Sequence, residues 1–318
     1  MSTLIVSSLQ ASGGTGTAAI LASINGGAIS GTRNRIINGD MQIDQRNAGA
    51  AQTITAAAAL AYSVDRWYAY CTGANVTGQR VQGATVGQFR YQFTGAASVT
   101  AIGFGQRIEQ LNSADLAGAT ATLSVDLANS VLTSVTWTAY YANTADTFGT
   151  LASPTRTQIA TGTFTVNSTV TRYSTQISVP AAATTGIEIV FTVGAQTSGT
   201  WTIGNVQLEA GSVATPFERR SYGQELALCQ RYYETSGIFN IFSGNVTNVG
   251  SYYHSVRYCA TKRAAPTVTP AISATFGFPV SAPTVGENKV DGFYCYMIAN
   301  SATASAFFQY SWISSIEL

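Results

Sequence analysis

The segment WTIGNVQLEAGSVATPFERRSYGQELALCQRYYE, residues 201–234, marks a change of structure along the chain. Its first part carries apolar side chains at near-alternate positions: Trp201, Ile203, Val206 and Leu208. This spacing is typical of a half-buried β-strand. Residues 211–216 contain Gly and Pro and follow no helical period, so we expect a turn there. The segment therefore predicts the last strand of a sheet, followed by an exit turn.

The second part of the segment has a helical pattern. Ser221 precedes Gln224 by three residues, which is the spacing of a capping box. Leu226, Cys229 and Tyr233 follow at i, i+3 and i+7, which is the apolar stripe of a short amphipathic helix. We therefore expect a helical collar over residues 220–234.

Upstream of the segment, residues 34–219 read as β structure. Five stretches alternate apolar and polar residues, with Gly, Asn, Asp, Ser and Thr between them: 89–93, 123–127, 135–141, 173–179 and 187–193. Such strands without intervening helices predict an antiparallel jelly-roll sandwich, so the fold class is all-β. Residues 106–115 are ambiguous, because Ile108 and Leu111 also fit a helical turn.

We interpret three tryptophans and one arginine of this region as structural residues. We expect Trp67 to be buried and Arg66 to pair with a nearby carboxylate, although Trp67 on a sugar-binding surface is the alternative. Trp137 and Trp201 lie in alternating strands and are expected in the core.

Downstream of the segment, residues 235–318 are rich in aromatics. They hold 14 of the 34 aromatic residues of the chain. Strand-like stretches at 251–258, 290–299 and 307–316 predict a small C-terminal β-sandwich that gains stability from association. Phe308, Tyr310 and Trp312 share one face of the last stretch.

Aromatic residues of this C-terminal domain are candidates for ligand contacts. Tyr294 and Tyr296 alternate with Phe293, Cys295 and Met297, so one of the two sets faces outward. Outward tyrosines suit a glycan, which stacks on the ring and hydrogen-bonds to the hydroxyl, but they also suit a subunit interface. The candidate glycan-binding residues are Tyr252, Tyr253, Tyr294, Tyr296 and Trp312. His254 is interpreted as a structural group.

Residues 1–33 differ from the rest. They are mostly Gly, Ala, Ser and Thr, with apolar clusters at 4–9 and 20–24. Such a segment buries too little apolar surface to fold alone, so we expect an extended arm that docks on a partner.

The order and spacing of several motifs carry a resemblance. The chain resembles tail-fibre and receptor-binding proteins of tailed bacteriophages over roughly residues 34–318. The matching segments are Gln207–Gly211, Ala214–Arg220, Glu225–Leu226, Cys229–Tyr233, Asn38–Met41 with Gln45–Arg46, Asp65–Trp67, Arg263–Val268 and Glu317–Leu318. The resemblance implies a virion protein with a carbohydrate-binding-module-like jelly roll.

The resemblance also sets expectations about partners. It implies that the arm attaches to other virion tail or adaptor proteins, with Leu4, Ile5, Val6 and Leu9 as the contacts. It implies a homotrimer, with Leu226, Cys229 and Tyr233 meeting about the axis. It implies recognition of host surface polysaccharide without cleavage, while a purely structural virion component, such as a head fibre or decoration, and a polysaccharide depolymerase are the alternatives.

Charge and hydropathy argue against a nucleic-acid-binding, membrane-spanning or secreted protein. The net charge is +1 and only 10% of residues are charged, against about 25% in an average protein. No basic run provides a nucleic-acid footprint. No stretch approaches the roughly 18 apolar residues of a membrane span, and the N-terminus lacks a secretory signal pattern. We therefore expect assembly in the host cytoplasm and release within the virion.

Catalytic and metal motifs are weak. Cys71, Cys229, Cys259 and Cys295 form no C-x-x-C pair, and one histidine does not complete a zinc site, so we expect four buried or half-buried thiols, no metal and no cofactor. The spacing of the carboxylates suggests no glycosidase pair, so we do not expect an enzyme. The carboxylates considered are Asp40, Asp44, Asp65, Glu109, Asp115, Asp126, Glu188 and Glu209. Asp40 and Asp44 are too few for calcium, and Glu209 is expected to hydrogen-bond to backbone.

Overall fold

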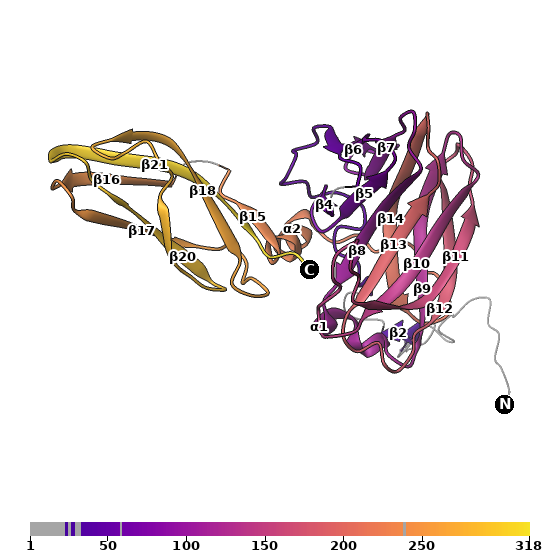
Figure 1. Cartoon of the computed structure of the whole chain (residues 1–318). Coiled ribbons are helices and arrows are strands. Elements are labelled where there is room, and N and C mark those ends of the chain that lie inside the picture. The colour runs from indigo at the N-terminus through magenta and orange to yellow at the C-terminus, as the bar shows by residue number, and fades with distance from the viewer. Residues whose placement is uncertain (1–22, 25–26, 29–32, 58, 238–239) are drawn as a thin grey trace, which may run out of the picture.

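The computed structural model describes residues 23–24, 27–28, 33–57, 59–237 and 240–318. Figure 1 shows two β-sandwiches with the short helix α2 (Tyr222–Gln230) between them. The strands of each sheet pair antiparallel, as the alternating patterns predict. The predicted all-β class is therefore confirmed.

The first sandwich is jelly-roll-like and consists of two six-stranded sheets. One sheet has the order β11 (Arg156–Thr165), β10 (Ser134–Ala142), β13 (Ile187–Val193), β8 (Ala101–Ile108), β5 (Tyr68–Thr72), β4 (Ala61–Tyr62). The other has the order β12 (Thr171–Ser178), β9 (Thr120–Asn129), β14 (Thr200–Ala210), β7 (Phe89–Thr94), β6 (Val76–Gln82), β3 (Gln52–Ile54). Three pairs of neighbours are consecutive in the chain, β4–β5, β6–β7 and β10–β11, and the other neighbours are distant in the sequence.

The inner faces of these sheets form one apolar core. Trp67, Trp137 and Trp201 are all buried in it, as predicted. The Trp67 ring stacks on Phe104 at a centroid distance of 4.8 Å, and its Nε1 donates a hydrogen bond to the Asn38 carbonyl at 2.9 Å. The structural interpretation of Trp67 is therefore confirmed, because no face of the ring reaches solvent.

The ambiguous segment at 106–115 contains both expected structures. Ile108 ends β8, and a short helix α1 (Gln110–Ser113) follows, continued by the 3₁₀ turn η1 (Ala114–Leu116). Ile108 is buried, whereas Leu111 points outward and is exposed.

Helix α2 forms where the sequence predicts it but differs in two respects. The Ser221 side chain makes no capping hydrogen bond, although its carbonyl accepts one from the Glu225 amide at 3.0 Å. The helix ends at Gln230, and Tyr233 begins strand β15 (Tyr233–Thr235). The capping box and the helical position of Tyr233 were therefore wrong, because pairing of β15 with the end of β21 (Thr303–Ser315) draws the chain out of the helix.

The second sandwich is organised by β21. Its sheet pairs β21 with β15 and β16 (Asn240–Val246) on one side and with β18 (Thr267–Phe276) on the other. The opposing sheet has the order β17 (Ser251–Arg257), β20 (Gly292–Ile298), β19 (Thr284–Asn288). Three aromatic side chains of β21 face the core together: Phe308, Tyr310 and Trp312. Trp312 packs against Phe293 of β20.

Residues near the end of β21 return to the first sandwich (Figure 1). Glu317 pairs with Arg66 and, at 2.7 Å, with Arg46. The Leu318 carbonyl accepts hydrogen bonds from Arg107 at 2.7 Å and from the Tyr62 hydroxyl at 2.9 Å. Arg66 therefore pairs with a carboxylate, as expected, but the partner is 251 residues away and not local.

Within residues 1–33 the structure describes two short strands, β1 (Ser23–Ile24) and β2 (Gly27–Ala28), which pair antiparallel. The attachment residues predicted at Leu4, Ile5, Val6 and Leu9 lie outside the described residues.

Candidate functional site

Three tyrosines gather on the outer face of the sheet β17–β20–β19. Tyr253 lies directly opposite Tyr296 in the register of β17 and β20. Its ring centroid is 5.4 Å from that of Tyr296 and 5.7 Å from that of Tyr294. We call Tyr253, Tyr294 and Tyr296 the tyrosine cluster. Its members come from two adjacent strands, so the rigid sheet sets their spacing.

The outward orientation of the cluster follows from the alternation of β20. Phe293, Cys295 and Met297 point into the core and are buried. Tyr294 and Tyr296, between them, must then point outward. The sequence left the choice of face open, and packing against β21 decides it.

A glycine of the neighbouring strand makes room for one ring of the cluster. A Cβ atom at Gly286 of β19 would lie 2.0 Å from Cε2 of Tyr294. The Tyr294 ring therefore lies flat across the backbone of β19, which any other residue at 286 would prevent. Sequence analysis missed Gly286, although a glycine inside a strand is a signal of such close approach.

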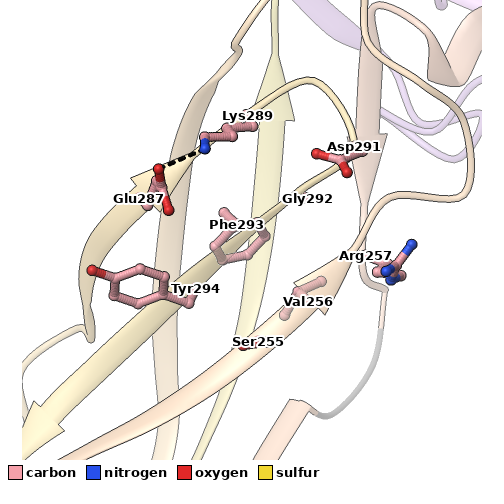
Figure 2. Close-up of a pocket in the computed structure, with 9 residues that line it drawn as sticks. All are labelled: Ser255, Val256, Arg257, Glu287, Lys289, Asp291, Gly292, Phe293 and Tyr294. Atoms are coloured by element: carbon pink, nitrogen blue, oxygen red, sulfur yellow. Dashed lines mark ion pairs between the residues drawn. The ribbon is translucent and has the colours of Figure 1, made fainter.

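A hollow of about 190 Å³ adjoins Tyr294 at the end of the sheet nearer the collar (Figure 2). Its charged lining residues are Arg257, Glu287, Lys289 and Asp291. Glu287 pairs with Lys289 at 2.7 Å, and this hydrogen bond raises the pKa of Lys289. The hollow thus offers both donors and acceptors beside an aromatic ring.

A second hollow, of about 200 Å³, adjoins Tyr296 on the other side of the cluster. It is lined by Ser281 and Thr284 together with apolar residues such as Pro279 and Ile298. The tyrosine cluster therefore lies between two depressions, one with charged lining residues and one without. Sequence analysis identified the rings but none of the polar residues around them, because strand alternation does not show which neighbouring strands and turns reach the same place on the face.

Two of the predicted glycan-binding residues lie elsewhere. Trp312 is buried in the core against Tyr258 and Phe293, so its predicted place on a ligand surface was wrong. Tyr252 alternates with Tyr253 and packs inward against Phe242 and Phe278. Inward packing follows from strand alternation, since two consecutive residues of a strand cannot share a face.

His254 fits its structural interpretation. It faces inward, and its Nδ1 lies 2.7 Å from the Tyr310 hydroxyl. Burial lowers the pKa of His254.

The predicted oligomer contacts are covered by the chain itself. Cys229 is buried with Ile37, Ile43 and Tyr232, and Leu226 packs against this cluster. Tyr233 is buried beneath the Arg46 guanidinium, which lies 3.7 Å from the ring centroid. Residues of the segment 36–46 thus cover Cys229 and Tyr233 within the chain, whereas Leu226 is half-buried.

The eight carboxylates considered for catalysis all have fixed partners. Six pair with arginine side chains: Asp40, Asp44, Glu109, Asp115, Asp126 and Glu188. Asp65 accepts hydrogen bonds from Gln45, and burial raises its pKa to about 6. Glu209 accepts from the Thr215 amide at 2.8 Å, which confirms its expected contact with backbone. Each of the eight therefore has at least one partner within the chain.

Cys71, Cys229 and Cys295 are buried free thiols, and Cys259 is exposed, which corrects its expected burial. Among the described residues there is no group of three or more potential metal-ligating side chains. In the same part of the chain, no helix has the length and apolar character needed to cross a membrane.

The first sandwich has a hollow of its own, of about 250 Å³, on the outer face of the sheet containing β7 and β14. Arg90, Gln92 and Thr202 contribute to its lining, and Gln92 donates to the Thr202 hydroxyl at 3.1 Å. Its lining residues include no aromatic ring, which distinguishes it from the tyrosine cluster.

Comparisons with known proteins give no family for this chain. No family model matches the sequence, and no curated protein matches it. Among solved structures, similar ones include the enzymatically active domain of tailspike protein 4 of bacteriophage CBA120, with 18% identity and a TM-score of 0.34, covering 56% of this chain and 21% of that chain. This chain thus matches only a minor part of the tailspike.

Two carbohydrate-binding modules are also similar. One is TmCBM61 in complex with β-1,4-galactotriose, with 11% identity and a TM-score of 0.36, covering 56% of this chain and 99% of that chain. The other is a family 11 module from Clostridium thermocellum in complex with a mixed-linked tetrasaccharide, with 13% identity and a TM-score of 0.32, covering 53% and 100%. At these scores the likeness carries no argument about the ligand of this chain.

Proposed function

We propose that this protein binds a host surface polysaccharide through the tyrosine cluster of its second sandwich, as a receptor-binding component of a bacteriophage tail. The observation that carries the proposal is the placement of Tyr253, Tyr294 and Tyr296 on one rigid sheet face between two hollows.

The chemistry of the face suits a saccharide. A sugar presents an apolar ring face rimmed by hydroxyl groups, and a tyrosine offers a ring for the first and a hydroxyl for the second. The two hollows lie on either side of the cluster, so a chain of several sugar units can extend from one to the other. Polar groups beside an aromatic surface are the usual composition of a small-ligand site.

The alternative of a subunit interface at the same rings is less favoured. Arg257, Glu287, Lys289 and Asp291 surround one end of the cluster, all of them exposed. Charged residues are depleted at the centre of interfaces, because their desolvation is costly. A hydrated ligand tolerates these charges more easily than an apolar partner face does.

The viral context rests on the sequence resemblance. On this proposal the arm at residues 1–33 joins other tail proteins, the protein acts within the virion after assembly in the host cytoplasm, and the polysaccharide is bound without cleavage. The fixed partners of the eight considered carboxylates support binding without cleavage. A head fibre or decoration without receptor contact remains the alternative role.

The proposal is tested with full-length protein and polysaccharide extracted from host envelopes. Tyr253→Ala and Tyr294→Ala should each weaken binding, by about fivefold if each ring contributes roughly 1 kcal/mol. Tyr222→Ala is the matched control, because Tyr222 on the collar helix is 58% exposed, the same fraction as Tyr253. Equal binding by the wild type and both cluster variants would refute the site.

A further inference from the structure

We propose that the outer face of the sheet formed by β16, β21 and β18 is the surface through which copies of this chain associate. We call it the uncharged face. It consists of Ile241 and Ser243 of β16, Phe307, Gln309, Ser311 and Ile313 of β21, and Thr269, Ala271 and Phe276 of β18.

Strand register places these residues on one side of the sheet. Phe307 lies opposite both Ser243 and Phe276, and Ile313 lies opposite Thr269. The residues between them on β21, including Phe308 and Tyr310, are buried in the core. Ile241, Phe276 and Ile313 are all exposed. Four large apolar side chains therefore extend along the outside of a sheet that nothing in the chain covers among the described residues.

The charges of the second sandwich lie away from this face. The sequences of β16, β18 and β21 contain no Asp, Glu, Lys or Arg. Arg257 and Glu287 are on the opposing sheet, and Lys289 and Asp291 are in the turn beside it. The outer face of a solvated antiparallel sheet is normally polar, and edge strands commonly carry charged residues that prevent pairing. An uncharged apolar outer face is instead typical of a surface that becomes covered.

The lack of charge favours another copy of the same chain as the partner. In a two-fold assembly a surface meets its own equivalent, so this apolar, uncharged face would be covered by another apolar, uncharged face. No charged group would then lose its solvent on either copy. A charged protein partner would find no complementary group here. A membrane is disfavoured, because surface binding to lipid relies on Lys and Arg beside the apolar residues.

The size of the face is sufficient for a weak to moderate interface. β21 has 13 residues, which at about 3.3 Å each gives a length of about 43 Å. β18 has 10 residues and β16 has 7, so three strands at a spacing of about 4.8 Å give a projected area of roughly 480 Å². Protruding side chains raise the accessible area above this projection. The result is below the roughly 800 Å² per partner of a standard interface, which fits weak association.

This placement leaves the tyrosine cluster accessible. The two faces are on opposite sheets of the same sandwich. Association through one face therefore presents several copies of the other, and repeated weak sites on one particle increase avidity.

Light scattering of the full-length protein tests the proposal. At micromolar concentration the wild type should have a mass that is a multiple of 33.3 kDa. Ile313→Glu should reduce the mass to that of one chain. Ile298→Glu is the control, because Ile298 is 50% exposed, close to the 42% of Ile313, but lies on the opposing sheet. A monomeric wild type, or an assembly that Ile313→Glu leaves intact, overturns the proposal.

A second measurement covers the case in which Ile313→Glu does not fold. Ser311→Cys, at the middle of the face, is prepared in a Cys259→Ser background, since Cys259 is the exposed thiol. The new thiol should react with a maleimide at least tenfold more slowly in the assembly than after dilution to the monomer. Equal reactivity at both concentrations overturns the proposal.

Discussion

Replacing Glu317 with Gln should destabilise the protein strongly, because this carboxylate neutralises arginines inside the first sandwich. Arg66 has 1% of its side chain exposed and Glu317 has 7%. Arg66 also donates to the Arg107 carbonyl and lies over the Tyr232 ring, at 3.5 Å from its centroid. Glutamine retains the volume and one acceptor oxygen but removes the charge.

The magnitude follows from the burial of the arginine. Removing one partner of a buried ion pair typically costs about 3–5 kcal/mol, because the other charge is left unpaired in a poorly solvated site. Glutamine can still accept a hydrogen bond, so we expect a loss near the lower value, about 3 kcal/mol. For a domain of this size each kcal/mol lowers the melting temperature by about 2–4 °C, which predicts a decrease of about 6–12 °C.

Calorimetry and urea unfolding measure both the loss and its location. Since Glu317 joins the second sandwich to the first, the Gln variant should also separate the unfolding transitions of the two. The control is Glu287→Gln, whose pair with Lys289 is 60% and 67% exposed and should change stability little, because solvent screens a surface ion pair. If Glu317→Gln changes stability no more than Glu287→Gln, the reasoning about a buried ion pair is refuted.

Four further predictions follow from the structure. Trp312→Ala should lower the free energy of unfolding by about 3–5 kcal/mol in urea titrations, because it empties a core site; a stable variant that has lost only glycan binding would contradict this. Burial lowers the pKa of His254, so its contribution to stability is present above pH 6.5 and lost as the pH falls below that value; His254→Gln should flatten this pH dependence in thermal melts, and an unchanged dependence would count against it. Incubation with host polysaccharide should release no reducing ends above buffer, whereas a clear rise would favour a depolymerase. Deletion of residues 1–33 should leave a folded protein that no longer joins the virion, and failure of the truncated protein to fold would place the arm inside the fold.

Local patterns in the sequence predicted much of the fold. Strand alternation compares residues two apart, so it was sufficient to predict the all-β class, the inward Trp137 and Trp201, and the opposite faces of Phe293 and Tyr294. The same patterns predicted α2 but not its end at Gln230, because β15 pairs with a strand about 80 residues later.

The candidate site was predicted only in part for the same reason. Alternation showed that Tyr252 and Tyr253 face opposite ways, but the packing of β17 and β20 against β21 decided which of them is outside. The glycine beneath Tyr294 is on β19, and the charges of the adjoining hollow come from β17, β19 and the turn between β19 and β20.

The sequence by itself determined the class of structure, the position of the collar and the set of aromatic residues from which the candidate site is drawn. The tertiary structure alone decided which groups are covered. Residues 36–46 pack against the collar stripe and Glu317 pairs with Arg66, whereas no described residue covers the uncharged face. The physical reason is that a periodic pattern reports that a face is apolar, whereas burial depends on residues that only the folded chain brings into contact.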